Sequence, residues 1–182
     1  TIEDTWEEFL DSGDPEFKEL VRPISNLLSR ERVGRSRYLR EEFTLIRSMW
    51  TPEGRKTHYP SFDRGEFSRT IPFPQDIRLD ILALLLRYEE HMLAGGMLDV
   101  LSLTHALLPV RQKIRELPSE KRFRFLLIDE FQDFSNLDLV ILREACSHSA
   151  QDGLFLAGDL VQKIMVKKLV LREAGFDSTA AR

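Results

Sequence analysis

Two short apolar runs, each with an acidic residue within two positions of its end, constrain the fold of this chain more than any other feature. The run 125–128 is followed by Asp129 and Glu130, and the run 154–157 by the dipeptide 158–159. Apolar runs without alternation are typical of strands buried on both faces. The sequence therefore predicts two buried strands that end in polar residues.

A helix with a clear start lies between the two runs. Ser135 is placed to be its N-cap, and Asp138 follows three residues later as the acid of a capping box. Strand, helix and strand within this length predict a right-handed βαβ unit with parallel strands.

The carboxyl ends of parallel strands meet at one edge of a sheet, where ligands bind in open α/β sheets. Asp129, Glu130 and Asp159 are expected along that edge, and Gln162 follows just beyond the second strand. Adjacent carboxylates suit a site that holds Mg²⁺ and orients a water for phosphoryl transfer. Asp129 is the first candidate metal ligand, with Glu130 as a second.

The residues at these strand ends resemble a known family. Positions 129–133 read Asp-Glu-Phe-Gln-Asp and positions 158–164 read Gly-Asp-Leu-Val-Gln-Lys-Ile. They are similar to motifs II and III of superfamily 1 DNA helicases of the UvrD/Rep type. The resemblance implies that Asp129 coordinates Mg²⁺, that Glu130 orients the hydrolytic water, and that Gln162 senses the γ-phosphate of ATP.

The same resemblance extends the candidate nucleotide site beyond the catalytic residues. It adds Gln132 from motif II, and Gly158 and Asp159 from the start of motif III. The alternative interpretation of these residues is an acidic strand end in an ordinary α/β domain.

Helix signals dominate the chain before residue 118. Asp14 and Pro15 are typical of a helix start, and Pro23 is expected to break or kink that helix. Residues 76–93 form the clearest predicted helix. The two glycines at positions 95 and 96 should end it.

The resemblance implies a predominantly helical α/β chain of two parts. Residues 1–96 are expected to form a helical subdomain like domain 1B, and 97–182 part of a RecA-like P-loop NTPase domain that carries motifs II and III. The sequence contains no Gly-x-x-x-x-Gly-Lys-Ser/Thr motif and starts at Thr1. We therefore expect a fragment of a longer helicase, with its remaining domains outside this chain.

A cluster of arginines between residues 30 and 40 is the candidate nucleic-acid contact, in particular Arg35, Arg37 and Arg40. The formal net charge of −4 gives no general basic field, so any contact with phosphates must be local. The alternative is a solvated basic helix face. The expected partner is DNA, as a single strand or a single-strand/duplex junction.

The composition also bounds the setting of the protein. The single cysteine, Cys146, cannot form an intrachain disulfide. We see no signal peptide and no apolar run long enough to cross a bilayer, so we expect a cytoplasmic protein, at the nucleoid, or in the nucleus if the source is eukaryotic, without a membrane partner.

These features favour a fragment of an ATP-dependent DNA helicase or translocase, which uses ATP and Mg²⁺ in DNA repair and is inactive as an ATPase by itself. Two other functions stay open. A helicase-like module without ATPase activity would bind protein or nucleic acid, and an upstream P-loop would argue against it. The second is a different Mg²⁺-dependent NTPase, but that function would not explain the presence of Gln132, Asp133 and Gln162.

Overall fold

The computed structural model describes residues 2–11, 13–62, 73–146 and 153–159. The chain divides into two compact units. The first comprises Thr1–Ile46 and Pro52–Asp99, and the second Arg47–Thr51 and Val100–Arg182. Over the described residues the chain is mostly helical with a small parallel sheet, which confirms the predicted predominantly helical α/β class.

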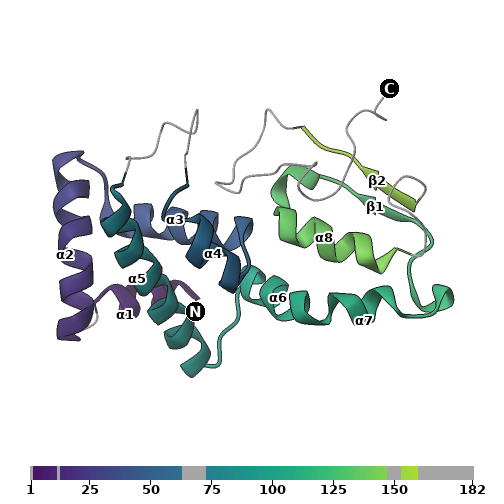
Figure 1. Cartoon of the computed structure of the whole chain (residues 1–182), viewed down its shortest axis with the longest axis horizontal. Helices are drawn as coiled ribbons and strands as arrows, with labels where there is room; N and C mark the ends of the chain where they lie inside the picture. Colours follow the sequence, from purple (N-terminus) through teal and green to yellow (C-terminus); the bar gives the residue numbers. More distant parts are fainter. Residues whose placement is uncertain (1, 12, 63–72, 147–152, 160–182) are drawn as a thin grey trace. The chain divides into compact units, whose positions relative to one another are not determined.

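Helices make up all the secondary structure described in the first unit, with turns between them. This unit contains α1 (Ile2–Leu10), α2 (Pro15–Arg30), most of α3 (Arg35–Met49), α4 (Pro52–His58) and α5 (Gln75–Ala94). Helix α5 packs against α1 and α2 (Figure 1). Tilted and T-shaped ring contacts join the aromatic side chains of its core, namely Trp6, Phe9, Phe17, Phe43 and Tyr88.

Helix α2 starts as predicted but is not broken at Pro23. The Asp14 carboxylate accepts the backbone N–H of Glu16 at 3.0 Å, and the helix then runs from Pro15 through Pro23. An internal proline costs about 3 kcal/mol. Each fully buried large apolar side chain contributes about 1.5–3 kcal/mol, so the packed face of α2 offsets that cost. This face consists of Phe17, Val21, Ile24 and Leu28.

Helix α5 extends the predicted helix by one residue at each end and stops at the predicted glycines. Gly95 is its C-cap, and Gly96 has a φ of 65°, a left-handed conformation that glycine adopts without a steric cost.

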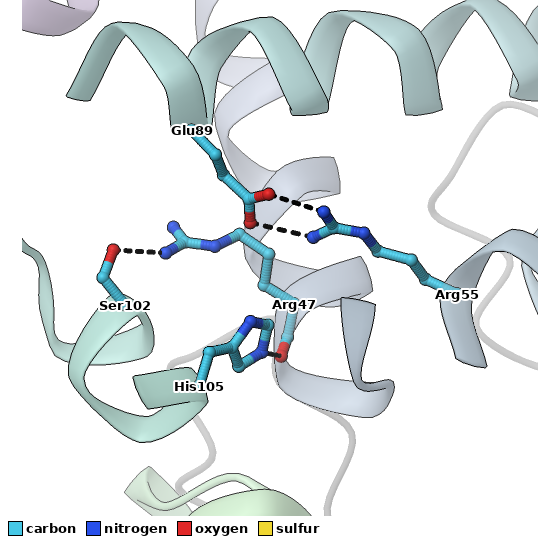
Figure 2. A network of polar contacts seen from close by, with 5 residues as sticks. All are labelled: Arg47, Arg55, Glu89, Ser102 and His105. Carbon is cyan, nitrogen blue, oxygen red and sulfur yellow. Dashed lines mark hydrogen bonds and ion pairs between the residues drawn. The ribbon is translucent and has the colours of Figure 1, made fainter. Parts of the chain in front are cut away.

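Buried polar pairs complete the first unit. Arg55 on α4 donates two hydrogen bonds to the Glu89 carboxylate on α5, at 2.8 and 2.5 Å (Figure 2). The buried Tyr59 hydroxyl donates to Glu42, and burial raises the pKa of Tyr59 well above its ordinary value. Because buried charges need a partner, these pairs fix the relative positions of α3, α4 and α5.

The second unit contains short helices and the two strands. Its helices are α6 (Val100–Leu107), α7 (Arg111–Arg115) and α8 (Asn136–Ala145), and its strands are β1 (Leu126–Ile128) and β2 (Leu154–Leu156). Arg47 is counted with this unit because it contacts α6. Its guanidinium donates to Ser102 Oγ at 2.8 Å, and its carbonyl oxygen lies 2.7 Å from His105 Nε2 (Figure 2).

Strands β1 and β2 pair in parallel, as the sequence predicts. Leu126, Leu127 and Ile128 lie opposite Leu154, Phe155 and Leu156. Helix α8 connects the strands and packs on one face of the sheet, where Leu139 joins Ile128 and Phe131 in a buried cluster. The parallel βαβ arrangement is therefore confirmed over the described residues.

The prediction that these strands are buried on both faces is wrong. Leu127 is 76% exposed, and its neighbour Phe155 is also exposed, as are Phe123 and Phe125. The reason is that α8 covers the opposite face, while these four side chains stay accessible to water. The assignments of 1–96 to a 1B-like subdomain and of 97–182 to a RecA-like domain stay predictions.

Candidate functional site

The candidate site lies where β1 and β2 end. Asp129 and Glu130 follow β1, and both side chains are exposed. Beyond the strands the backbones stay paired, because Ala157 N–H donates to the Ile128 carbonyl at 2.8 Å and Phe131 N–H donates to the Ala157 carbonyl at 3.1 Å. The two segments that follow the strands are therefore held side by side.

Glu130 has an unusual backbone conformation. Its φ of 51° and ψ of 42° lie in the left-handed region, which costs a residue other than glycine about 1–2 kcal/mol. The Asp129 carboxylate accepts the Glu130 N–H at 3.0 Å, and the chain then forms a 3-10 helix, Phe131–Asp133. Such strain is typical of functional sites. It turns the chain sharply and leaves both acids at the strand end.

Gln132 connects the two strand ends through its side-chain amide. It is 4% exposed, its Nε2 donates to the Glu130 carboxylate, and its Oε1 accepts the backbone N–H of Asp159 at 3.1 Å. The amide orientation follows from its neighbours, because a backbone N–H only donates and a carboxylate only accepts.

Gly158 lies close against this amide. A Cβ atom at position 158 would lie 2.0 Å from Gln132 Oε1 and 2.9 Å from Phe131 Cδ1. These distances are too short for any side chain, so a glycine is required here by the close approach of the two segments.

Helix α8 follows the 3-10 helix 131–133, and side-chain hydrogen bonds hold its first turn in place. Ser135 and Asp138 form the predicted capping box, with Asp138 N–H donating to Ser135 Oγ at 3.1 Å and Ser135 N–H to Asp138 Oδ2 at 2.8 Å. Thr104 on α6 also donates to the Asp138 carboxylate. The start of α8 is thereby fixed to α6, within the second unit.

One comparison with known proteins identifies the family. The family model for the UvrD/REP helicase N-terminal domain matches residues 66–165. The chain belongs to this family. Comparisons with curated proteins and with solved structures returned no match.

The matched segment contains every UvrD/REP motif residue that the sequence analysis singled out. Asp129, Glu130 and Gln132 lie together after β1, and Gly158 and Asp159 meet them after β2. Gln162 lies outside the described residues, so its assignment as γ-phosphate sensor stays a prediction.

UvrD/REP helicases use ATP with Mg²⁺, and the carboxylates at the strand end fit this ion. Mg²⁺ commonly takes one or two carboxylates, with waters and substrate phosphates as its other ligands. No group of three or more His, Cys, Asp or Glu side chains that could hold a metal occurs among the described residues. The exposed pair Asp129 and Glu130 matches this pattern of few carboxylate ligands.

The candidate nucleic-acid residues lie on the first turns of α3, outside the segment that the UvrD/REP family matches. Arg35, Arg37 and Arg40 are exposed. Arg37 donates to Glu41 at 2.8 Å, and this hydrogen bond raises the pKa of the guanidinium. Arg30, the last residue of α2, and Arg32, in the turn between α2 and α3, are also exposed.

Two functional features could not be found from the sequence. The motif match placed Gln132 at the nucleotide, but its buried bridge depends on the pairing of strands about 30 residues apart. The strained conformation of Glu130 carries no sequence signal, because glutamate is not a residue that favours it.

In the described part of the chain, no helix is long and apolar enough to span a membrane.

Proposed function

We propose that this chain supplies the magnesium-binding and water-orienting part of an ATP-dependent DNA helicase or translocase. The observation that supports this most directly is the hydrogen-bonded meeting of the two strand ends, which brings Asp129 and Glu130 beside Gly158 and Asp159. Ligands of open parallel sheets bind at such an edge.

Each residue has a distinct role in this proposal. Asp129 helps to hold Mg²⁺, with Glu130 as a further ligand or a partner to its waters, and the ion would neutralise charge on the phosphate oxygens of ATP. Glu130 orients the attacking water, because its carboxylate accepts a hydrogen bond from water. Gly158 and Asp159 border the nucleotide, and Gln162 contacts the γ-phosphate.

The test is Glu130→Gln in the complete gene product that contains this chain. Turnover should fall by about 10²–10⁴-fold, the usual contribution of a positioned acid–base group, while ATP binding is retained. Glu120→Gln, at an exposed glutamate of the same unit, is the matched control and should leave turnover unchanged. A near-normal turnover number for Glu130→Gln would refute the proposed role.

DNA contact by the arginines around the start of α3 is the second part of the proposal. Each phosphate contact adds about 0.9 to the slope of log affinity against log salt for duplex DNA, and about 0.7 for single strands. Arg35→Ala with Arg37→Ala should flatten that slope by roughly one to two units for every DNA sequence. Fluorescence anisotropy at several salt concentrations measures it.

The control for this titration is the pair Arg111→Ala and Lys113→Ala, which removes the same charge from exposed positions of α7. Single-stranded and junction oligonucleotides should be compared with duplex. Equal slopes for the α3 variant and the wild-type protein would leave these arginines as a solvated helix face.

A helicase-like binding module without ATPase activity is the second candidate, and the absence of a P-loop from the gene upstream of Thr1 would favour it. Under either proposal the 182-residue chain alone should release no phosphate with Mg²⁺ and single-stranded DNA. DNA-stimulated phosphate release that Glu130→Gln abolishes would overturn that expectation. A P-loop encoded upstream of Thr1 would favour the motor over the module.

A further inference from the structure

The Gln132 side chain is buried at a site whose acids are exposed, and this contrast bears on its role. The residue is 4% exposed, and its side-chain amide makes one hydrogen bond on each side, to the Glu130 carboxylate and to the Asp159 backbone. A side chain so enclosed is poorly placed to contact a nucleotide directly. It is well placed to act through the two groups that it binds.

The bond to Glu130 restricts a flexible side chain. A glutamate on the surface samples several rotamers, and holding one conformation costs free energy. A hydrogen bond from a buried amide is sheltered from competition with water and therefore holds its partner more firmly than an exposed bond does. Gln132 thus limits the directions in which the Glu130 carboxylate can present its oxygens.

The bond to Asp159 extends this order to the second strand end. The Asp159 N–H can reach Gln132 Oε1 because position 158 has no side chain. Any Cβ there would overlap the amide oxygen. The missing side chain at position 158 therefore leaves the space that the Gln132 amide occupies, and this space permits the hydrogen bond to Asp159.

We propose that Gln132 is a positioning residue. Its side chain links the Glu130 carboxylate to the Asp159 backbone, so that the segments after β1 and β2, which contain motif II and the start of motif III, move together. The inference rests on the proposed function, since it assigns Gln132 an effect on the water that Glu130 orients. It replaces direct nucleotide contact as the role of Gln132.

Two substitutions separate the two bonds. Gln132→Glu keeps an oxygen for the Asp159 N–H but can no longer donate to Glu130, whereas Gln132→Ala removes both bonds. The matched control is Gln112→Glu, because Gln112 on α7 also donates to a glutamate, Glu116, at 2.9 Å, but is exposed.

Amide hydrogen exchange of the nucleotide-free complete gene product is the first measurement. The Asp159 amide should lose protection in Gln132→Ala and keep it in Gln132→Glu. Steady-state kinetics is the second measurement. Both variants should lower kcat by about 10–100-fold, the usual effect of removing a group that orients a catalytic residue, with KM for ATP little changed.

Gly158→Ala gives an independent check on the same contact. It should release the Asp159 amide and lower kcat in the wild-type background, yet add less in a Gln132→Ala background, where the overlap with Oε1 is gone and only the contacts of 2.9 and 3.1 Å with Phe131 remain. Fully additive effects on kcat would overturn the inference.

The outcomes distinguish the inference from the proposed function. If Glu130→Gln keeps normal turnover, the proposed function fails. If Glu130→Gln abolishes turnover but Gln132→Glu keeps a wild-type kcat, only the positioning role fails. An equal fall in kcat for Gln112→Glu would also refute it, because added charge rather than position would then explain the effect.

Discussion

The two units of this chain differ in how far their side chains are enclosed and in whether they contain the candidate site. In the first unit, long helices enclose aromatic rings, and Arg55 and Tyr59 are buried with acidic partners. In the second unit, α8 covers one face of a two-stranded sheet, while Leu127 and Phe155 stay exposed on the other. The candidate site lies in the less enclosed unit, where a strained residue and exposed carboxylates can meet a ligand. Binding residues commonly occur in the less stable parts of a protein.

The largest expected effect tests whether the helices of the first unit provide its stability. Leu84→Ala removes a fully buried side chain (0% exposed) from α5, and should lower the free energy of unfolding by about 2–5 kcal/mol. Leu93→Ala on the same helix is the control, because Leu93 is 72% exposed; its cost should stay within about 0.5 kcal/mol.

Urea unfolding of both variants measures the difference, and hydrogen exchange locates it. Protection should fall in α2 and α5 for Leu84→Ala, while the amides of α8 keep theirs. Equal losses in α5 and α8 would show that the two units unfold as one, so that neither unit has a stability of its own.

A smaller effect concerns an ion pair within the second unit. Arg115 Nε on α7 donates to the Glu144 carboxylate on α8 at 2.6 Å, and this hydrogen bond is the main reason that the pKa of Glu144 lies below its ordinary value. A carboxyl group whose pKa falls on folding stabilises the protein above its unfolded-state pKa, and that stabilisation is lost as the pH falls through the folded-state pKa.

Arg115→Gln should therefore lower the free energy of unfolding only modestly near neutral pH, because Arg115 is largely exposed and solvent screens the pair. The cost should shrink as the pH falls below the ordinary glutamate pKa of about 4.3. Thermal unfolding between pH 3 and pH 7 gives both quantities, with Arg111→Gln on the same helix as the control. A cost that does not change with pH would point to packing rather than charge.

The smallest effect compares the left-handed residues of the two units. Within the described residues, Arg32 and Glu130 are the non-glycine positions with positive φ. Arg32→Gly should stabilise by roughly 0.5–1 kcal/mol, because relief of a strain of about 1–2 kcal/mol exceeds the entropic cost of glycine. Glu130→Gly should gain less, since it also loses the hydrogen bond from Gln132.

Thermal unfolding tests this pair, with Arg32→Ala as the control that keeps the strain. Turnover should be unaffected by Arg32→Gly and abolished by Glu130→Gly. A gain as large for Arg32→Ala as for Arg32→Gly would show that the strained backbone is not the cause.

Local signals predicted much of the fold correctly. The capping box of Ser135 and Asp138 and the glycine stop after α5 depend on residues a few positions apart, so the sequence contains the whole interaction. Parallel pairing followed from two apolar runs and the helix between them. Helix α2 shows the limit of local rules, because packing against α5 overrides the effect of Pro23.

Features that depend on distant neighbours could not be predicted. The exposure of Leu127 depends on what covers each face of the sheet, and an apolar run alone does not contain that information. The candidate acids were found because they are adjacent in sequence and match a family motif. The link between Gln132 and Asp159 needed the register of the two strands. Gln162 lies outside the described residues, so that part of the site stays a prediction.

The close approach of Gly158 to the Gln132 amide also has a consequence for evolution. A side chain at position 158 would have to displace the Gln132 amide, and it would also meet the Phe131 ring at 2.9 Å and the Phe131 backbone nitrogen at 3.1 Å. A smaller residue at position 132 removes only the first of these contacts. Among relatives that keep this turn, position 158 should therefore stay glycine even where position 132 has changed.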